Sequence, residues 1–398
     1  MLSVAEATRA VIDRVPRMGS ERVPLERAAG RVLAEHVVAA RALPGFDNSA
    51  MDGYAARSAE LPGVLPVSGV VAAGMLEVPV LPVGAALRIF TGAPMPVGAD
   101  TVVLQEDAVR DGDRVRLPAS PAGENVRRAG EDVAIGERPI AAGTRLGGWD
   151  IGLMAALGMT EVAVSRAPRV ALIATGDELV DVATPPALGQ LVDSSVHALA
   201  VLVREAGGTA DRLGIARDDM ASLADRFAAS RGYDVVITTG GVSVGDRDYV
   251  RDALAAAGIS LELYKVAMKP GKPFSFGMRG GAHPAPVFGL PGNPVSTVSA
   301  FELFLRPALL AMQGARDIAR PEVTVYVAGG YRKEAGRAHY VRSRVVRDGD
   351  RLIATPHPKQ GSAMLSSLIN CNALVVVAAE LTELAPGAAA PALLLEAV

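Results

Sequence analysis

The region from residue 167 to about residue 313 constrains the fold most, because apolar runs of five to seven residues alternate there with helical stretches. This alternation is typical of a parallel sheet covered by helices on both faces. The predicted strands are residues 169–175, 209–215, 234–238 and 286–290, with 261–268 as a more exposed fifth. The predicted helices are 194–206, 220–229, 248–257 and 294–312. We therefore expect an α/β domain at the centre of the chain.

The flanking regions have a different pattern. Residues 45–147 are interrupted by Gly and Pro every few positions, with short β-rich runs at 87–91 and 101–105, which predicts a small, mostly β domain. After Pro321, short strands are predicted at 323–327, 341–346, 352–355 and 373–377, and the Ala-rich stretch 386–390 is interpreted as a turn. Residues 1–15 are expected to form an amphipathic helix. A chain of 398 residues is too long for one core, so several domains are expected.

Composition excludes several classes of protein. The net charge of −3 gives no electrostatic support for binding nucleic acid. The single cysteine, Cys371, excludes an internal disulfide and a Cys-rich metal centre, and it agrees with a reducing compartment. The N-terminus lacks a secretory signal, and no uncharged apolar run reaches the roughly 20 residues that cross a bilayer. We expect a cytoplasmic protein with no membrane partner.

Four polar, glycine-rich segments each follow a predicted strand, at residues 175–179, 239–246, 269–273 and 290–294. Ligands bind beyond the carboxyl ends of strands in an open parallel sheet, so these segments are expected to converge on one crevice. The Gly240-Gly241 pair lets backbone N–H groups approach a phosphate, although an ordinary strand-to-helix turn explains it equally. Asn293 is expected to cap a helix whose first turn holds Pro294, which is either an anion site or simply a good helix start.

Charged residues occur in the same segments. Lys269 and Lys272 flank a Pro-Gly turn and would together attract an oxyanion, unless both are solvated lysines on a loop tip. Carboxylates stand at or just beyond the strand ends and suit a magnesium ion that bridges protein and phosphate: Glu178, Asp218, Asp246 and Asp248. Asp177, Asp219 and Asp246 could equally be helix caps. No Ser-His-Asp, Cys-His or His-rich metal pattern is present.

The small β region contains two polar clusters. Residues 46–55, Phe-Asp-Asn-Ser-Ala-Met-Asp-Gly-Tyr-Ala, carry two carboxylates, an amide and a hydroxyl in a dense group. Residues 127–132, Arg-Arg-Ala-Gly-Glu-Asp, form a charged group that could also be a solvated loop. Both clusters are candidates for ligand contact.

With these segments in order, the sequence resembles the molybdopterin molybdenumtransferase (MoeA) family, which includes the C-terminal domain of gephyrin. The resemblance rests on residues 46–55, Thr91-Gly92-Ala93, 128–132, 269–273 and 289–294, and it extends over the whole chain. It implies an elongated homodimer with four domains per subunit. These are a linker and dimerisation domain (1–46 and 140–166), a small β domain (47–139), a three-layer α/β/α molybdopterin-binding domain (167–320) and a β-barrel-like domain (321–398).

The resemblance also implies roles for individual residues. Glu178, Asp246 and Asp248 would hold magnesium, and Asp248 would be the essential carboxylate near the phosphates. The remaining catalytic residues would be Asp52, Lys265 and Lys269. Residues that would bind the pterin, its nucleotide or the oxyanion are Thr91, Arg128, Asp132, Thr175, Gly176, Asp193, Asp218, Gly240, Gly241, Ser243, Lys272, Pro291, Gly292, Asn293, Pro294, Arg342 and Ser362.

The resemblance further implies that the active crevice lies between the α/β domain of one subunit and the small β domain of its partner. Asp52 and Asp132 would then act across the dimer interface. Molybdate would lie among Lys269, Lys272, Arg342 and Ser362. Two positions depart from the family pattern: Ser195 stands where an Asn is usual, and Thr239 replaces a commoner Ser.

The function implied by the resemblance is insertion of molybdate into adenylylated molybdopterin, with release of AMP and formation of molybdenum cofactor. A molybdopterin adenylyltransferase and recipient molybdoenzymes would be partners. Two alternatives stay open. One is a molybdopterin adenylyltransferase, whose fold resembles the central domain alone, and the other is a gephyrin-like scaffold protein.

Overall fold

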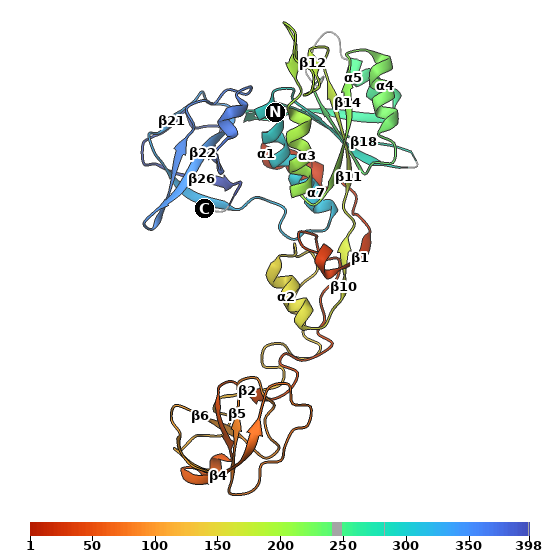
Figure 1. Cartoon of the computed structure of the whole chain (residues 1–398). Coiled ribbons are helices and arrows are strands. Elements are labelled where there is room, and N and C mark those ends of the chain that lie inside the picture. Colours follow the sequence, from red (N-terminus) through yellow and green to blue (C-terminus); the bar gives the residue numbers. More distant parts are fainter. Residues whose placement is uncertain (241–248, 282, 397) are drawn as a thin grey trace.

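The computed structural model describes residues 1–240, 249–281, 283–396 and 398. The molecule is elongated (Figure 1). An α/β domain and a C-terminal β domain lie side by side at one end, a narrow linker leads away from them, and a small β domain forms the other end.

The α/β domain contains a six-stranded sheet of order β14-β11-β15-β19-β18-β16. These strands are β11 (Arg169–Thr175), β14 (Thr209–Ala216), β15 (Val235–Thr239), β16 (Ile259–Lys265), β18 (Pro273–Arg279) and β19 (Ala285–Leu290). The predicted strands are all present. The sheet is not wholly parallel, however, because β18 runs antiparallel to both β19 and β16.

Strand β18 was not predicted, because its Ser and Gly residues closely follow a Pro-Gly turn and resemble a loop. Gly277 of β18 is needed for close strand packing, since a Cβ there would lie 2.0 Å from the Ser260 carbonyl oxygen. A glycine inside a strand often marks such a close backbone approach.

Helices cover both faces of this sheet and form a three-layer domain. One apolar core lies against α1 (Val4–Ile12), α3 (Ser195–Glu205), α6 (Pro294–Ala300), the π-helical η3 (Phe301–Leu305) and α7 (Arg306–Met312). The other lies against α4 (Met220–Ala229) and α5 (Tyr249–Ala256). Along β11, Val170 and Leu172 face the first core and Ala171 and Ile173 the second.

One continuous helical segment, Pro294–Met312, is long and apolar enough to cross a membrane by length and composition. It is 89% buried inside the domain, so it is the central helix of a core. A π-helical turn in its middle replaces the regular helix predicted from the sequence.

The linker is built from two separate passages of the chain. Strand β1 (Ser20–Pro24) pairs antiparallel with β10 (Glu161–Ser165), and the short η1 (Leu25–Arg27) and α2 (Gly148–Ala156) pack on the same core. Val23, Met154 and Val164 are buried in that core. Both passages are needed to close it.

The small β domain is a sheet of order β6-β3-β5-β4-β8-β7. Its elements are β2 (Asn48–Ser49), β3 (Gly53–Ala56), η2 (Ser58–Glu60), β4 (Gly63–Val71), β5 (Ala86–Ile89), β6 (Thr101–Leu104), β7 (Val109–Asp111), β8 (Arg114–Leu117) and β9 (Val126–Arg127). Strand β2 pairs with β9 and joins the two polar clusters found in the sequence.

The C-terminal domain is a closed barrel of five strands, in which β22, β23, β20, β26 and β24 each pair with the next and β24 pairs again with β22. Their bounds are β20 (Glu322–Val327), β22 (Ala338–Asp348), β23 (Arg351–Pro356), β24 (Ala373–Val377) and β26 (Ala389–Leu394), with β21 (Tyr331–Arg332), β25 (Glu383–Leu384) and η4 (Leu365–Leu368) outside the barrel. The predicted turn at 386–390 is wrong at its end, because Ala389 and Ala390 pair with β20 and the side chain of Ala390 is buried in the barrel core.

A buried ion pair links the central helix to the segment that leads into the barrel. Arg320 donates to both carboxylate oxygens of Glu302, at 2.8 and 3.0 Å, and also to the Leu395 carbonyl at 2.9 Å. The side chain of Glu302 is only 4% exposed. We predict that Glu302→Ala destabilises the protein by about 3–5 kcal/mol, because it leaves the Arg320 cation buried without its partner.

Chemical denaturation provides the measurement. The exposed pair Arg332–Glu383 is the matched control, since its side chains are 82% and 49% exposed. Glu383→Ala is expected to cost less than about 1 kcal/mol. Equal effects of the two substitutions would contradict the prediction.

Candidate active site

The glycine-rich segments meet at one end of the central sheet, as predicted. Ala174 of β11 is in register with Thr239 of β15, which is in register with Leu290 of β19, so the three strands end together. Lys265 at the end of β16 is opposite Pro273 at the start of β18. The connection 266–272 therefore lies at the same end. Gly241 is outside the described residues, and Gly240 represents that segment.

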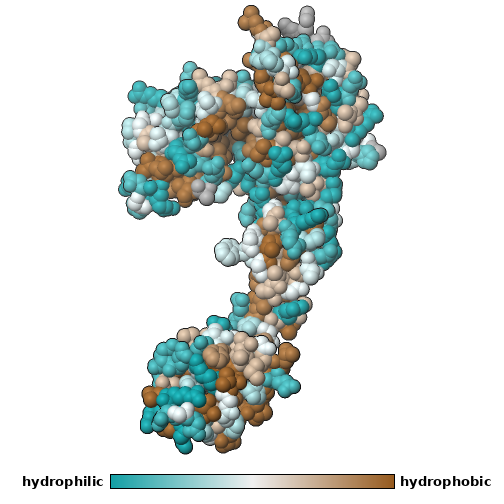
Figure 2. Space-filling model, in the orientation of Figure 1, coloured by the Kyte–Doolittle hydropathy of each residue, from teal (hydrophilic) through white to brown (hydrophobic). Residues whose placement is uncertain are grey.

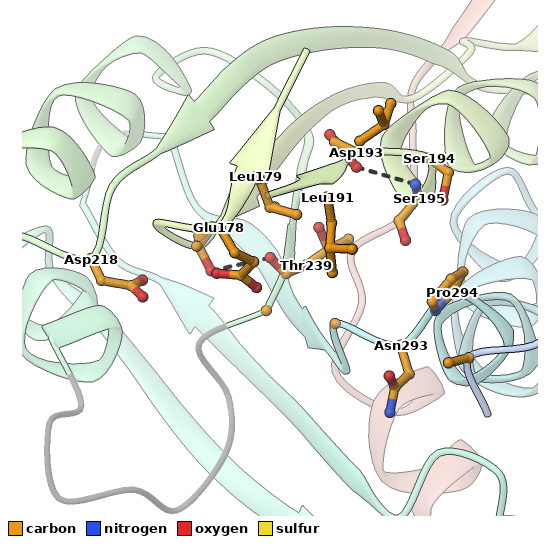
Figure 3. A pocket seen from close by; sticks show the side chains of 16 residues that line it. Glu178, Leu179, Leu191, Asp193, Ser194, Ser195, Asp218, Thr239, Asn293 and Pro294 are labelled. Carbon is orange, nitrogen blue, oxygen red and sulfur yellow. Dashed lines mark hydrogen bonds between the residues drawn. The ribbon is translucent and has the colours of Figure 1, made fainter. Parts of the chain in front are cut away.

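A cavity of about 540 Å³ opens at this end of the sheet. It brings together many of the predicted residues: Thr175, Gly176, Glu178, Asp193, Asp218, Gly240, Gly292, Asn293 and Pro294. Figure 3 shows Asn293 and Pro294 on one side of the cavity and Glu178 and Asp218 on the other. Such a cavity is large enough for a cofactor-sized ligand.

The cavity floor requires glycine. Gly240 has φ +85°, and a Cβ there would lie 2.4 Å from the Thr175 carbonyl oxygen. The Thr175 hydroxyl donates to the Thr239 carbonyl at 3.1 Å, and the Gly240 N–H donates to the Leu290 carbonyl at 3.1 Å. The three strand ends are thus joined by short contacts, which leave room for a ligand to approach the backbone.

The start of α6 differs from the prediction in one respect. Pro294 occupies the first turn as expected, but Asn293 does not cap the helix with its side chain. Its amide instead donates to the Ser362 hydroxyl at 3.2 Å, and the Val295 N–H donates to the Ser362 carbonyl at 3.1 Å. The C-terminal domain therefore occupies the position that a side-chain cap would take.

Asp193 has a structural role at the cavity wall. Its Oδ1 accepts hydrogen bonds from the N–H groups of Ser195 and Val196, at 3.1 and 3.3 Å, at the start of α3. Burial raises the pKa of Asp193 despite these bonds. Ser195 itself is buried and lines the cavity.

Two leucines complete the cavity, and the sequence analysis did not single them out. Leu179 and Leu191 belong to β12 (Leu179–Val180) and β13 (Leu191–Val192), a short parallel pair beside the sheet. Leu191 is 62% exposed yet lines the cavity, so the two leucines give the cavity an apolar wall. Nothing in the sequence separated these two residues from ordinary core leucines.

Carboxylates cluster at the cavity edge. Burial raises the pKa of Asp218, and the charges of Asp177 and Glu178 raise it further. The Asp218 N–H donates to Asp177 Oδ1 at 3.1 Å. Asp219 is a helix cap, because its side chain accepts from the Ser222 N–H at the start of α4. A bound cation would reduce the electrostatic repulsion among these carboxylates.

Magnesium fits these oxygen donors in kind. Within the described part of the chain, however, no three or more His, Cys, Asp or Glu residues form a metal-binding group. Ser243, Asp246 and Asp248 lie outside the described residues. Of the three predicted magnesium ligands, only Glu178 can thus be placed at the cavity.

The loop with the predicted lysines joins the sheet to the barrel. Lys265, Lys269 and Lys272 are exposed, and the Val266 N–H closes the loop by donating to the Lys272 carbonyl at 3.1 Å. Strand β17 (Met268–Lys269) pairs parallel with β22, which sets Lys269 against His339. Burial lowers the pKa of His339 to about 4, with further lowering by nearby cations, of which Lys269 has the largest effect.

Arg342 is fully buried in the barrel wall next to this loop. Its Nη2 donates to the carbonyls of Lys359 and Gly361, at 3.1 and 3.2 Å. Its Nε and Nη1 are buried and have no hydrogen-bond partner among the described residues. Burial lowers the pKa of Arg342. Because an unsatisfied buried cation is costly, this guanidinium is well suited to hold an anion.

Six predicted residues near this end of the sheet do not line the cavity: Lys265, Lys269, Lys272, Pro291, Arg342 and Ser362. Four further predicted residues are remote from it. These residues lie in or beside the small β domain, at the opposite end of the molecule (Figure 1): Asp52, Thr91, Arg128 and Asp132. Asp52 accepts from the Thr91 N–H and hydroxyl, both at 2.8 Å, and the pKa of Asp52 is lowered by these bonds.

The polar residues of segment 46–55 do not form the single dense cluster predicted from the sequence. Asp47 pairs with Arg128 at 2.7 Å and the Ala129 N–H at 2.8 Å, whereas Asp52 bonds to Thr91. The Ser49 hydroxyl donates to the Met51 carbonyl. The segment consists of β2 and the first residues of β3 joined by a bend at residues 50–52, and its two carboxylates bond to separate neighbours.

Comparison with known proteins places the chain in a family. Three family models match successive parts: the MoeA N-terminal region (domain I and II) at residues 2–158, a probable molybdopterin binding domain at 171–311, and the MoeA C-terminal region (domain IV) at 324–395. The chain therefore belongs to the MoeA family.

Relatives and solved structures agree over nearly the full length. Molybdopterin molybdenumtransferase 2 of Mycobacterium tuberculosis is 37% identical, over 97% of this chain and 98% of that protein. Molybdopterin molybdenumtransferase of Haemophilus influenzae is 33% identical, over 96% and 95%. The crystal structure of the molybdopterin biosynthesis MoeA protein from Pyrococcus horikoshii superimposes with a TM-score of 0.85 at 30% identity, covering 99% of this chain and all of that one.

The acidic cluster leads to a pH-dependent prediction. The pKa of Asp218 is raised above 3.8 in the folded protein, so its ionised form destabilises the fold above that pH and the penalty disappears as the pH falls below it. Asp218→Asn is therefore expected to raise Tm at pH 7 and to leave it unchanged near pH 3.

Thermal unfolding at the two pH values tests this prediction. Asp225→Asn, at an exposed position of α4, is the control and should not raise Tm at pH 7. An Asp218→Asn variant less stable than wild type at pH 7 would count against mutual repulsion at the cavity edge.

Proposed function

We propose that this chain is a molybdopterin molybdenumtransferase, which inserts molybdate into adenylylated molybdopterin and releases AMP and molybdenum cofactor. Its membership of the MoeA family supports this, as do relatives of that name at 33–39% identity. The observation that carries the proposal is the cavity at the end of the sheet, which is lined by Gly240, Gly292 and the start of α6 and suits a phosphate-linked ligand. Arg342, buried in β22 with two unpartnered nitrogens, supports an anion site in the adjoining barrel.

In this proposal the adenylylated pterin occupies the cavity at the end of the sheet. Its phosphate lies near Gly240, Gly292 and the start of α6, where the positive end of the helix dipole favours negative charge. A ring of the ligand packs on Leu179 and Leu191. Thr175, Gly176 and Pro294 complete the walls, and Pro291 directly precedes Gly292. Gly241 and Ser243 follow Gly240 in the same segment.

Molybdate binds among Lys269, Lys272, Arg342 and Ser362. The Nε and Nη1 groups of Arg342 donate to molybdate oxygens, and the lysines add two flexible positive charges at the open side. Both reactants are anions, so the main task of the protein is to offset their repulsion with cations positioned in advance. Lys265 contributes a third ammonium group to the same loop.

We propose that Glu178, Asp246 and Asp248 hold magnesium beside the phosphate, with Asp218 close by. When bound, the ion would neutralise phosphate charge. Asp248 is proposed to be the essential member.

We propose a homodimer in which the small β domain of one subunit reaches the cavity of its partner, so that Asp52, Thr91, Arg128 and Asp132 complete the site. Residues 1–46 and 140–166 would provide the dimer contact. Trp149 of α2 is 95% exposed in the single chain. Leu76 and Val83 of the small β domain are 98% and 86% exposed, and Figure 2 shows apolar surface on this domain. We further propose a cytoplasmic location, with a molybdopterin adenylyltransferase and recipient molybdoenzymes as partners.

Formation of molybdenum cofactor from purified adenylylated molybdopterin and molybdate tests the proposed activity. Arg342→Met is expected to abolish molybdate binding and to keep the fold, because Met fills the space without leaving a buried charge. Lys269→Ala should raise the molybdate KM about tenfold or less, since an exposed ammonium contributes no more than about 1.4 kcal/mol, and it should spare the pterin KM.

The outcome that would contradict this assignment is wild-type molybdate affinity in Arg342→Met. ATP-dependent adenylylation of molybdopterin by this protein alone would instead favour a molybdopterin adenylyltransferase.

Mixed dimers test whether the site is shared between subunits. Asp52→Ala and Arg342→Met homodimers should both be inactive. After subunit exchange, half of the dimers are mixed and each has one intact site, so about a quarter of wild-type activity is expected to return, as the symmetry of a two-fold dimer requires. Activity assays before and after exchange provide the measurement, and no recovery would place both residues in one chain's site.

A further inference from the structure

The first residues of the chain are paired with the lysine loop. The Leu2 N–H donates to the Lys265 carbonyl at 3.0 Å, and the Ala267 N–H donates to the Leu2 carbonyl at 2.8 Å. Leu2 and Val266 thus form a parallel β-bridge. These bonds lie immediately before Met268 and Lys269 in the loop.

The opposite side of the loop is held by the barrel. The Ala338 N–H donates to the Ala267 carbonyl at 2.9 Å, and β17 continues the pairing with β22. Ala267 is therefore bonded to Leu2 through its N–H and to the barrel through its carbonyl. In Figure 1 the N-terminus lies at this junction of the two domains. The loop backbone is therefore hydrogen-bonded to the N-terminal segment on one side and to the barrel on the other.

Leu2 is itself fixed by the start of α1. Ser3 and Glu6 form a capping box, in which the Glu6 N–H donates to the Ser3 hydroxyl at 3.2 Å and the Ser3 N–H donates to Glu6 Oε2 at 2.7 Å. The helix is anchored in the core through the fully buried Ala7 and Val11. The capping box therefore fixes the direction in which the chain runs from Leu2 into α1.

The lysines need such support. Lys269 and Lys272 are exposed and carry like charges on long flexible stems, so their mean positions depend on the backbone that carries them. If the loop samples other conformations, the apparent affinity for an anion falls in proportion to the fraction of molecules in the competent one.

We propose that Leu2 and the Ser3–Glu6 capping box are positioning residues for the oxyanion site, because they hold the loop that bears Lys265, Lys269 and Lys272 against the barrel that bears Arg342. This inference rests on the proposed function for its ligand, molybdate. The contacts of Leu2 with Lys265 and Ala267, together with the Ser3–Glu6 capping box, are called the clamp below. The clamp is a property of the fold and can be measured without a ligand.

Two substitutions release the clamp by different chemistry. Leu2→Pro removes the N–H that bonds to Lys265, and Ser3→Ala removes the helix cap. Ser3→Asp is the rescue variant, since Asp is also a good N-cap residue. Val11→Ala is the matched control, because it weakens the packing of the same helix and leaves the Leu2 bonds in place.

Amide hydrogen exchange of the peptide covering residues 265–272 reports on the clamp without any ligand. Leu2→Pro and Ser3→Ala are expected to speed this exchange, whereas Ser3→Asp should restore the wild-type rate. Unchanged exchange in both releasing variants would overturn the inference, whatever the protein's activity.

Titration of the full-length protein with molybdate alone, followed by steady-state kinetics, tests the consequence. Leu2→Pro and Ser3→Ala should weaken molybdate binding roughly three- to tenfold and leave the pterin KM unchanged, if the competent fraction falls to about a third to a tenth. Equal weakening in Val11→Ala, or unchanged affinity in the two releasing variants, would refute the positioning role. Failure of the wild-type protein to bind molybdate would instead refute the proposed function, while the exchange measurement still judges the clamp.

Discussion

The pairing of Met268 and Lys269 with the barrel strand β22 is the contact on which the whole site depends. It joins the α/β domain to the barrel, whose Tyr340 and Leu374 also pack in the α/β core, and it connects the exposed lysine loop to the strand that holds the buried Arg342. The hydrogen bonds from Asn293 and Val295 to Ser362 reinforce the same contact from the other side of the crevice. The site is therefore complete only when the two domains are docked against each other.

Much of the central fold was predictable because buried strands and amphipathic helices leave strong local patterns. The convergence of the glycine-rich segments followed from the rule that parallel strands end together. The antiparallel strand β18 was missed, because the approach of Gly277 to Ser260 is a long-range contact with no local signature. The side chain of Asn293 was assigned to its own helix for the same reason, since its true partner, Ser362, lies 69 residues further along the chain.

The site itself was less accessible to reasoning from residues alone. Arg342 and Ser362 could be named only through the family resemblance, because a single arginine in a short strand usually points to solvent. Its burial, with two nitrogens left unpartnered, became visible only with the structure. Leu179 and Leu191 show the opposite problem, since apolar residues are common and only their position at the cavity distinguishes them. The carboxylates were found easily, but Asp219 has the structural role of a cap.

The two-passage linker has a consequence for how the polypeptide matures. Strand β1 pairs with β10, and the whole small β domain is encoded between them. During synthesis the whole small β domain leaves the ribosome before β10 does, so β1 cannot yet pair with β10. The apolar residues of the first passage, such as Val23 and Leu33, stay uncovered during this interval. The linker core can therefore close only after β10 has been synthesised, and folding domain by domain would place this step after folding of the small β domain.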